Sequence, residues 1–196
     1  MRKPRVRPAV FLDRDGTINE DVGHLDRLDR LTLFPYAIDA VRLLNRAGFT
    51  VVVVTNQGGV AAGLVGESFV LEVHEVLRRR FEAGGATIER FYHCPHDPDA
   101  AVEAYRRPCE CRKPAPGMIH RAAADLELDP RRSYVIGDKL SDVRLAEAVG
   151  ATGILVRTGY GVTQAARVDA AVDGIVVRDL MAATVLILEQ QPDTFS

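Results

Sequence analysis

The sequence predicts an α/β fold of three layers, in which helices cover both faces of a central, mainly parallel sheet. Short apolar runs alternate with amphipathic segments along the whole chain, as β-α units do. The 196 residues, 47% of them hydrophobic, can bury one substantial core and suit a single domain over 1–196 better than two. No internal repeat or low-complexity linker interrupts the pattern.

Two runs are typical of central strands. "AVFL" at 9–12 and "TVVVVT" at 50–55 are apolar or β-branched, too short for helices, and bounded by polar or turn-forming residues. Weaker runs of the same kind lie at 88–92, 133–137, 152–156 and 173–177. We therefore expect five or six strands.

Helices are predicted between these strands. The segment 36–47 places Ile38, Val41, Leu43 and Leu44 on one stripe, and it stops at Gly48, a common helix end. Similar stripes predict helices over 67–83, 117–127, 140–149 and 178–189, with their apolar faces in the core. The irregular segments 19–35, 57–66 and 93–116 remain, and loops of this kind usually carry the chemistry of an α/β domain.

Charge and cysteine content narrow the class of protein. Lys plus Arg number 25 and Asp plus Glu 27, so we expect a small-molecule partner rather than nucleic acid or a membrane. The basic start, 1–7, is expected to be a flexible tail rather than a signal peptide. Three cysteines in one loop form no disulfide framework and favour a reducing cytoplasm. No spare apolar stripe points to a large interface, and a monomer is expected.

Polar residues follow three of the predicted strands at the point where each strand ends. Asp13-Arg14-Asp15-Gly16-Thr17 comes after the first strand, Thr55-Asn56 after the second and Asp138-Lys139 after 133–137. Each group alone has a structural explanation as a turn or a helix cap. However, the carboxyl ends of parallel strands meet at one edge of a sheet, where ligands bind. The three groups together therefore predict a site at that edge.

Phosphoryl transfer is the chemistry that these residues could perform together. Asp13 and Asp138 offer the hard oxygen ligands that Mg²⁺ prefers. Asp13 could attack phosphorus and form an aspartyl-phosphate, while Asp15 protonates the departing oxygen and later deprotonates a water. Thr55 and Lys113 could stabilise the equatorial phosphoryl oxygens by hydrogen bond and charge.

The motifs "FLDRDGTIN", "VVVVTNQGG", "CRKPAPGM" and "VIGDKLSD" resemble, in order and spacing, the four motifs of the haloacid-dehalogenase (HAD) phosphatase superfamily. The resemblance implies a Rossmann-like fold with Asp13 as nucleophile and Asp15 as acid/base. It also implies Mg²⁺ held by Asp13, the Asp15 main-chain carbonyl and Asp138. Asp142 is either a second acid of the metal site or a helix-start charge, and both interpretations stay open. The gap from Thr17 to Tyr36 is too short for a large cap domain.

All three cysteines and one histidine form a candidate zinc site. Cys94, His96, Cys109 and Cys111 supply a closed Cys₃His set, with 12 residues between His96 and Cys109. The alternative is a group of buried cysteines without metal. His93 is left out, because strand alternation points it away from Cys94. Such a closed site is structural, and zinc would order the loop 93–112 in place of apolar packing.

The cysteine loop narrows the resemblance from the whole superfamily to its zinc-bearing members. Zinc-bearing members with "CPH" and "CxCRKP" include D-glycero-D-manno-heptose 1,7-bisphosphate 7-phosphatases and histidinol-phosphate phosphatases, and the long linker resembles the heptose branch. Removal of the C7 phosphate from heptose 1,7-bisphosphate is thus implied. His24 stands where relatives commonly have Tyr. The resemblance implies these substrate-binding residues: Asp21, Val22, Gly23, His24, Asn56, Gln57, Gly58, Arg112 and Lys139.

Three alternatives stay open at this point. Histidinol phosphate could be the substrate, since only linker length argues against it. A phospho-accepting receiver module also combines acids, Thr and Lys on a parallel sheet, but it has no second acid two residues after the acceptor and no zinc loop. The third alternative is a catalytically inactive binding protein. Such a protein would not need to keep the matched catalytic residues, and all of them are present here.

Overall fold

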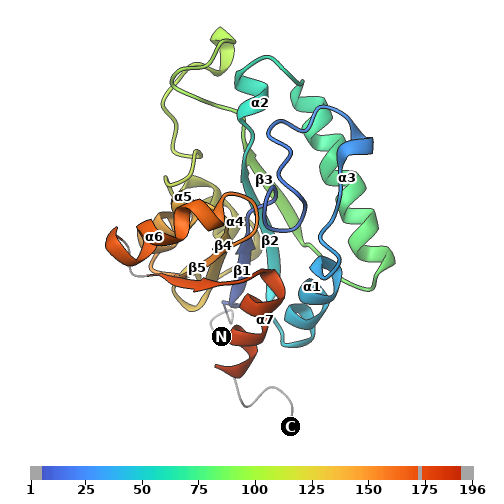
Figure 1. Cartoon of the computed structure of the whole chain (residues 1–196), viewed down its shortest axis with the longest axis vertical. Coiled ribbons are helices and arrows are strands. Elements are labelled where there is room, and N and C mark those ends of the chain that lie inside the picture. Colours follow the sequence, from blue (N-terminus) through green and yellow to red (C-terminus); the bar gives the residue numbers. More distant parts are fainter. Residues whose placement is uncertain (1–5, 172–173, 191–196) are drawn as a thin grey trace, which may run out of the picture.

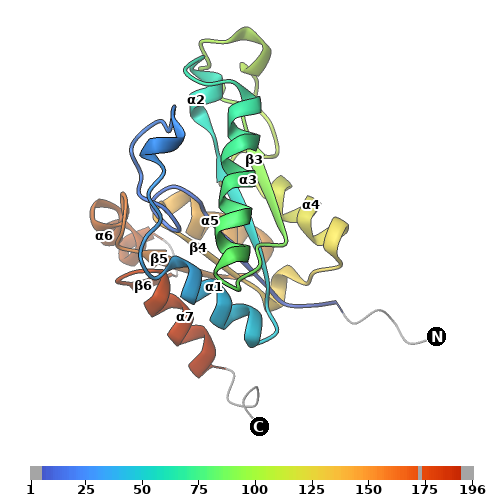
Figure 2. The same ribbon diagram turned by 90° about the vertical axis from the view of Figure 1, so that its right-hand side faces the viewer.

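The computed structural model describes residues 6–171 and 174–190, and its centre is a sheet of six parallel strands. The sheet order is β3-β2-β1-β4-β5-β6. Figure 1 labels β1 to β5, and Figure 2 labels β6. The strands are β1 (Ala9–Leu12), β2 (Thr50–Asn56), β3 (Arg90–Cys94), β4 (Tyr134–Gly137), β5 (Thr152–Val156) and β6 (Ile175–Val177). The chain builds outward from β1 to β3 and then returns to place β4 beside β1. This reversal makes β1 and β4 the topological switch point, where open α/β sheets bind ligands.

Helices cover both faces of the sheet, as predicted (Figures 1 and 2). Alternate strand residues pack on α1, α3 and α7 on one face and on α4, α5 and α6 on the other. The α-helices are α1 (Ala37–Arg46), α2 (Gly58–Ala61), α3 (Glu67–Ala83), α4 (Gly117–Leu126), α5 (Leu140–Val149), α6 (Gly161–Ala171) and α7 (Leu180–Glu189). Three short 3₁₀ turns lie at Leu28–Arg30, Glu103–Tyr105 and Pro130–Arg132.

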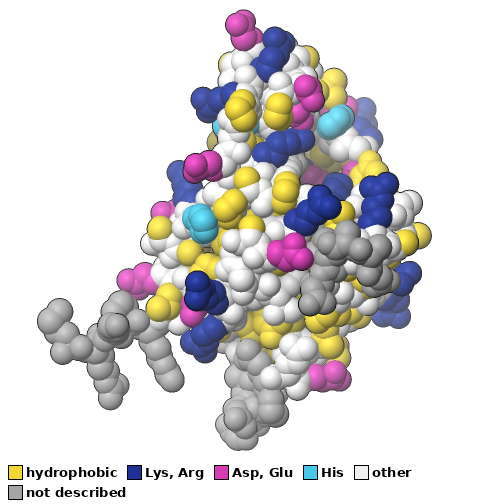
Figure 3. All heavy atoms as spheres, turned by 90° about the vertical axis from the view of Figure 1, so that its left-hand side faces the viewer, with side chains coloured by type: hydrophobic (Ala, Val, Ile, Leu, Met, Phe, Trp, Pro, Cys, Tyr) yellow, Lys and Arg dark blue, Asp and Glu magenta, His cyan; other side chains and the backbone are white. Residues whose placement is uncertain are grey.

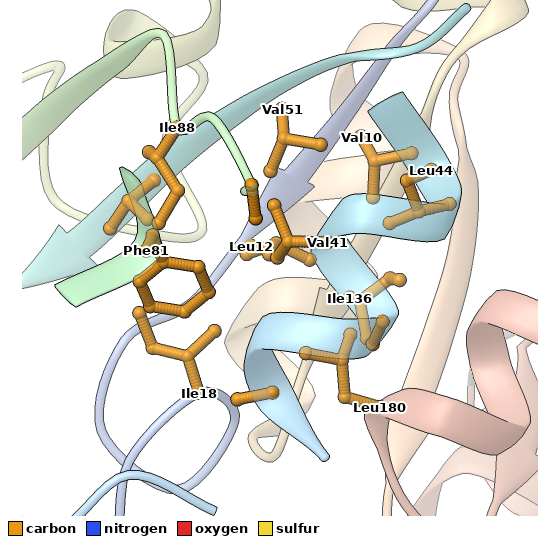
Figure 4. Packing of buried hydrophobic residues seen from close by; sticks show 14 of the residues in the cluster. Val10, Leu12, Ile18, Val41, Leu44, Val51, Phe81, Ile88, Ile136 and Leu180 are labelled. Carbon is orange, nitrogen blue, oxygen red and sulfur yellow. The ribbon is translucent and has the colours of Figure 1, made fainter. Parts of the chain in front are cut away.

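The larger core lies between the sheet and α1, α3 and α7. Figure 4 shows strand side chains such as Leu12 and Ile136 packed against Val41 of α1, Phe81 of α3 and Leu180 of α7. Full burial of each such side chain contributes about 1.5–3 kcal/mol. Residues on β1 and β4 are buried along their whole length, so the two strands that lead into the switch point are rigidly held.

Two parts of the structure differ from the sequence prediction. The third strand begins and ends two residues later than 88–92, and the predicted strand start at 173 lies outside the described residues. The helix α6 was not predicted, because few of its side chains enter the core. At Arg7, the last residue of the predicted tail, the backbone N–H donates to Glu127 O (3.1 Å); residues 1–5 lie outside the described part.

The described surface carries charges of both signs. On the face in Figure 3, cationic and anionic side chains are interspersed, in agreement with the net charge of -2. Among the residues that the structure describes, no helix has both the length and the apolar character needed to cross a bilayer.

Candidate active site

Three buried carboxylates meet at the carboxyl ends of β1 and β4. Asp13 follows β1, Asp138 follows β4 and Asp142 lies in the first turn of α5, and one oxygen from each lies within 4.8 Å of the others. None of the three residues is more than 4% exposed. The sequence correctly brought Asp13 and Asp138 together, because both follow strands that are neighbours in the sheet.

Lys113 is the cation inside this cluster. Its Nζ lies 2.8 Å from Asp13 Oδ1 and 2.6 Å from Asp142 Oδ1, and it donates to Val54 O at 3.0 Å. Burial opposes the charge on Lys113, but the carboxylates of Asp13 and Asp142 outweigh it and raise the Lys113 pKa. Asn56 holds the lysine backbone by two bonds, one from Lys113 N (3.0 Å) and one to Lys113 O (3.2 Å). This side-chain amide is therefore committed to the protein itself.

The cluster has the properties of a site for a divalent cation. Lys139 Nζ also reaches the cluster, 3.9 Å from Asp138 Oδ1, but burial together with the Asp13 charge still raises the pKa of Asp138 to about 8. Asp138 Oδ2 accepts from the Tyr160 backbone N–H (2.8 Å), whereas the buried Oδ1 has no hydrogen-bond partner in the described part of the chain. A buried carboxylate oxygen that accepts no hydrogen bond is costly unless it ligates a metal. Hard oxygen donors of this kind fit Mg²⁺.

Asp142 has two roles in this geometry. Its Oδ2 accepts from the Lys139 backbone N–H (3.1 Å) as part of a capping box at the start of α5. Its Oδ1 pairs with Lys113. The helix-start interpretation of Asp142 is thus confirmed, and its position in the acidic cluster also keeps it near the candidate metal site.

Asp15 turns its carboxylate toward polar partners beside the cluster. Arg14 donates from Nε to Oδ1 (3.1 Å) and from Nη2 to Oδ2 (2.8 Å), while Asn19 and Gln57 donate one further bond each. Burial opposes ionisation of Asp15, but Arg14 outweighs it and holds the Asp15 pKa below its usual range. Gln57 also donates to Thr55 Oγ1 (3.0 Å), which links Thr55 to the same network.

A cavity of about 450 Å³ opens beside these residues. Residues predicted to bind substrate or act in catalysis line it: Asp15, Asp21, Gly23, His24, Asn56, Gln57, Gly58, Arg112, Lys113 and Lys139. Val22 does not line the cavity, because its side chain packs against the core. Five further residues line it without having been predicted: Leu25, Gly59, Val65, Ser141 and Tyr160. Tyr160 follows β5, so the strand-end argument applied to one more strand could have found it.

Two cations stand at the cavity wall, each held by the protein. Arg112 pairs with Asp97 Oδ2 (2.6 Å) and donates to His96 O (2.9 Å). Lys139 pairs with Asp21 Oδ2 (3.1 Å) and lies over the Tyr160 ring, 4.8 Å from its centroid. Both side chains are about one-third exposed, so they can still meet an anionic ligand.

Gly16 and Gly159 allow the backbone to approach Asp138 closely. Both have positive φ, +85° and +54°, and a Cβ at either position would overlap Asp138 Oδ2. Thr158 Oγ1 donates to Gly16 O (2.5 Å) and joins the two loops. Gly159 was missed by the sequence analysis, since a glycine alone carries no signal of its neighbours.

Gly16→Ala is expected to lower catalytic activity about 100-fold, because the added Cβ displaces Asp138, and a shift of about 1 Å at reacting groups costs that much. Gly48→Ala is the matched control. Gly48 has the same φ of +85° but no atom within 4 Å of its Cβ, so it should lose stability through backbone strain and keep full activity. Kinetics and thermal melts of both variants measure the difference, and equal activity loss would contradict the explanation.

The cysteine loop forms a compact donor cluster. Cys111 Sγ lies 3.0 Å from Cys94 Sγ and 3.2 Å from Cys109 Sγ, and His96 Nδ1 lies 3.3 Å from Cys111 Sγ. All three cysteines are free, and one atom of each of the four residues lies within 4.8 Å of the others. His93 is directed elsewhere, with Nε2 2.9 Å from Glu67 Oε1. Three thiols and an imidazole at this spacing fit structural Zn²⁺.

Comparisons with known proteins agree with this geometry. A family model described as HAD-hydrolase-like matches residues 110–183. The D-glycero-beta-D-manno-heptose-1,7-bisphosphate 7-phosphatase of Yersinia pestis is 43% identical over 80% of this chain and 84% of its own. The Escherichia coli K12 protein of the same name is 43% identical, over 80% and 82%.

Solved structures give the same result. The D,D-heptose 1,7-bisphosphate phosphatase of B. bronchiseptica, complexed with magnesium and phosphate, superposes with a TM-score of 0.83. It is 31% identical, over 93% of this chain and 99% of its own. The D,D-heptose 1,7-bisphosphate phosphatase from Burkholderia thailandensis has a TM-score of 0.68 and 29% identity, over 93% and 99%.

Proposed function

Because this chain belongs to the heptose-1,7-bisphosphate 7-phosphatase family of HAD-like hydrolases, we propose that it hydrolyses the C7 phosphate of D-glycero-D-manno-heptose 1,7-bisphosphate. The products are heptose 1-phosphate and inorganic phosphate. The observation that carries the proposal is the buried cluster of Asp13, Asp138, Asp142 and Lys113 beside a cavity with two further cations. Such a site suits one phosphate at the acids and a second at the cavity wall.

In the first half-reaction a carboxylate oxygen of Asp13 attacks phosphorus while the bond from phosphorus to the C7 oxygen breaks. The bonds from Lys113 Nζ (2.8 Å) and Arg14 N (2.7 Å) both reach Asp13 Oδ1 and hold that oxygen in place. The negative charge of the bound phosphate opposes the effect of Arg14 and favours protonation of Asp15. Asp15 then gives its proton to the departing C7 oxygen, so the sugar leaves as an alcohol. Lys113 and Thr55 stabilise the equatorial oxygens.

In the second half-reaction Asp15, now ionised, takes a proton from water, and the hydroxide attacks the phosphorus of the aspartyl-phosphate. The bond to Asp13 breaks and the nucleophile is restored. Mg²⁺ held by Asp13, Asp138 and the Asp15 main-chain carbonyl would neutralise charge on the phosphoryl oxygens. The burial of Asp13 and Asp138 strengthens each of these electrostatic interactions.

Recognition of the sugar is assigned to the cavity wall. Asp21, Gly23 and His24 contribute to this wall, and so do Gln57 and Gly58, where β2 passes into α2. Asn56 also lines the cavity, but its amide is bound to the Lys113 backbone. Arg112 and Lys139 supply the positive charge that the C1 phosphate requires. The Arg112 position depends on the cysteine loop, because both of its partners, Asp97 and the His96 carbonyl, belong to that loop.

The substrate is tested by phosphate release from the β and α anomers of heptose 1,7-bisphosphate and from histidinol phosphate. We expect kcat/KM for the β anomer, the form in the relatives' name, to exceed that for histidinol phosphate by about 100-fold or more. Histidinol phosphate lacks a second phosphate, and each lost charge-assisted contact costs about 1.5–3 kcal/mol. Equal or reversed preference would contradict the heptose assignment. Phosphorylation that persists for minutes without turnover would instead favour a receiver module.

We also propose that the enzyme is a cytoplasmic monomer made of one domain. Free thiols as zinc ligands require a reducing compartment, which supports the location. Light scattering of the purified protein measures the oligomeric state directly.

A further inference from the structure

We propose that Arg14 is a positioning residue, which orients the Asp15 carboxyl group for proton transfer to the leaving-group oxygen. This inference rests on the proposed phosphatase chemistry and extends it to a side chain with no assigned part. Arg14 is the largest of the fully buried side chains in the described structure, with 1% exposure. Arginine is almost never fully buried unless its guanidinium is paired, so the partners of Arg14 indicate its use.

The guanidinium of Arg14 holds Asp15 with two parallel bonds. Nε donates to Oδ1 at 3.1 Å and Nη2 donates to Oδ2 at 2.8 Å. Bidentate pairs of this type fix the plane of a carboxylate as well as its position. Asn19 adds a bond to Oδ1 (2.9 Å) and Gln57 a bond to Oδ2 (3.0 Å). Both Asp15 oxygens are thus oriented from inside the protein, while Asp15 still lines the cavity.

Arg14 is itself fixed from behind. Its Nη2 also donates to Gln57 Oε1 (3.0 Å), and its Nη1 lies 3.5 Å from Nε2 of the buried His74 on α3. The His74 ring stacks on Phe91 of β3, with 4.9 Å between centroids. Burial and the Arg14 charge lower the pKa of His74 to about 3, so the imidazole is neutral and its Nε2 can accept a hydrogen bond. The side chains of His74, Arg14 and Asp15 are therefore each held in one orientation by their neighbours.

The orientation of Asp15 matters most for esters whose leaving group depends on its proton. An alkoxide is a poor leaving group and needs that proton, whereas p-nitrophenolate departs without it. Loss of Arg14 should therefore slow alkyl esters selectively. A residue that only supported the fold would slow both classes of ester alike.

The test measures alcohol release in a single turnover of wild type, Arg14→Ala and Arg14→Lys. The substrates are heptose 1,7-bisphosphate, a simple alkyl phosphate and p-nitrophenyl phosphate. In Arg14→Ala we expect alkyl esters to slow about 100-fold, within the range that general acid catalysis contributes, and p-nitrophenyl phosphate to change only about threefold. Arg14→Lys should fall in between, because an ammonium cannot make the bidentate pair. Millimolar guanidinium chloride should restore alcohol release from alkyl phosphates in Arg14→Ala but not in Asp15→Asn.

A second pair of variants keeps the proposal testable where Arg14→Ala fails to fold. His74→Gln retains an acceptor for Arg14 and should keep activity, whereas His74→Leu removes it and should slow alkyl esters selectively. Equal slowing of both ester classes in every folded variant would overturn the positioning role. Wild-type protein that hydrolyses the simple esters but not the heptose substrate would contradict only the heptose assignment, and the Arg14 result would still stand.

Discussion

Asp13→Asn is expected to reduce phosphate release by at least about 10⁴-fold, the scale on which loss of a covalent nucleophile acts. The neutral amide is a poor nucleophile toward phosphorus and a weaker ligand for a hard cation than a carboxylate. The amide oxygen can still accept the backbone bond that Arg14 N donates to Oδ1 in the wild type (2.7 Å). Steady-state kinetics with heptose 1,7-bisphosphate at saturating Mg²⁺ measure the loss.

This variant should fold as well as the wild type, which separates chemistry from stability. Asp13, Asp138 and Asp142 repel one another in the metal-free protein, and removal of one charge relieves that repulsion. Lys113 keeps its partner Asp142 at 2.6 Å. Thermal melts without Mg²⁺ should show an unchanged or higher Tm. Mass spectrometry must exclude deamidation of the introduced asparagine back to aspartate, and full activity of an intact Asp13→Asn protein would contradict the nucleophile assignment.

The sheet and the strand-end acids were the most predictable parts of the molecule. Burial on both faces makes a parallel strand a continuous apolar run, and "AVFL" matches β1 residue for residue. Because β1 and β4 are neighbours, the residues that directly follow them lie close together for any conformation of the connecting loops. For this reason the sequence could place Asp13 and Asp138 in one site. Lys113 was added to that site because it lies in the motif "CRKPAPGM".

Contacts between distant segments could not be predicted. The link between Arg14 and His74 joins residues that are 60 positions apart, and its only sign in the sequence is a histidine on the apolar stripe of a helix. Most such histidines are simply buried in a core. Asn56 likewise looks like a substrate ligand, but its amide holds the Lys113 backbone in the structure. Side-chain partners of this kind depend on how distant segments pack together, and the spacing of residues in the sequence does not predict that packing.

The cysteine loop depends on its ligand cluster because apolar packing supplies little order there. From Asp97 to Pro108 the structure has one buried residue, Ala100. The loop meets the rest of the protein through a few contacts, including the bond from Val102 N to Ala61 O (3.0 Å). Yet Arg112 and Lys113 follow Cys111 directly, and Lys113 must reach the buried acids. A metal held by Cys94, His96, Cys109 and Cys111 would fix the point from which both cations extend.

Cys109→Ser is therefore expected to lose bound zinc and to lower kcat/KM about 100-fold at saturating Mg²⁺. The serine hydroxyl is a poor Zn²⁺ ligand, and release of the loop displaces Arg112 and Lys113 from their anionic partners. Elemental analysis should find close to one zinc per chain in the wild type and none in the variant. Cobalt-loaded wild type should show thiolate-to-metal absorption that the variant lacks.

Glu110→Gln is the matched control, since Glu110 lies between Cys109 and Cys111 with an exposed side chain. Its backbone carbonyl, which accepts from Gly117 N (2.7 Å), is unchanged by the substitution. This variant should keep both zinc and activity, so loss in Cys109→Ser alone is attributable to the thiolate. Asp13 and Asp15 are untouched in either protein. A metal-free Cys109→Ser protein with full activity would therefore show that Arg112 and Lys113 reach the phosphate without help from zinc.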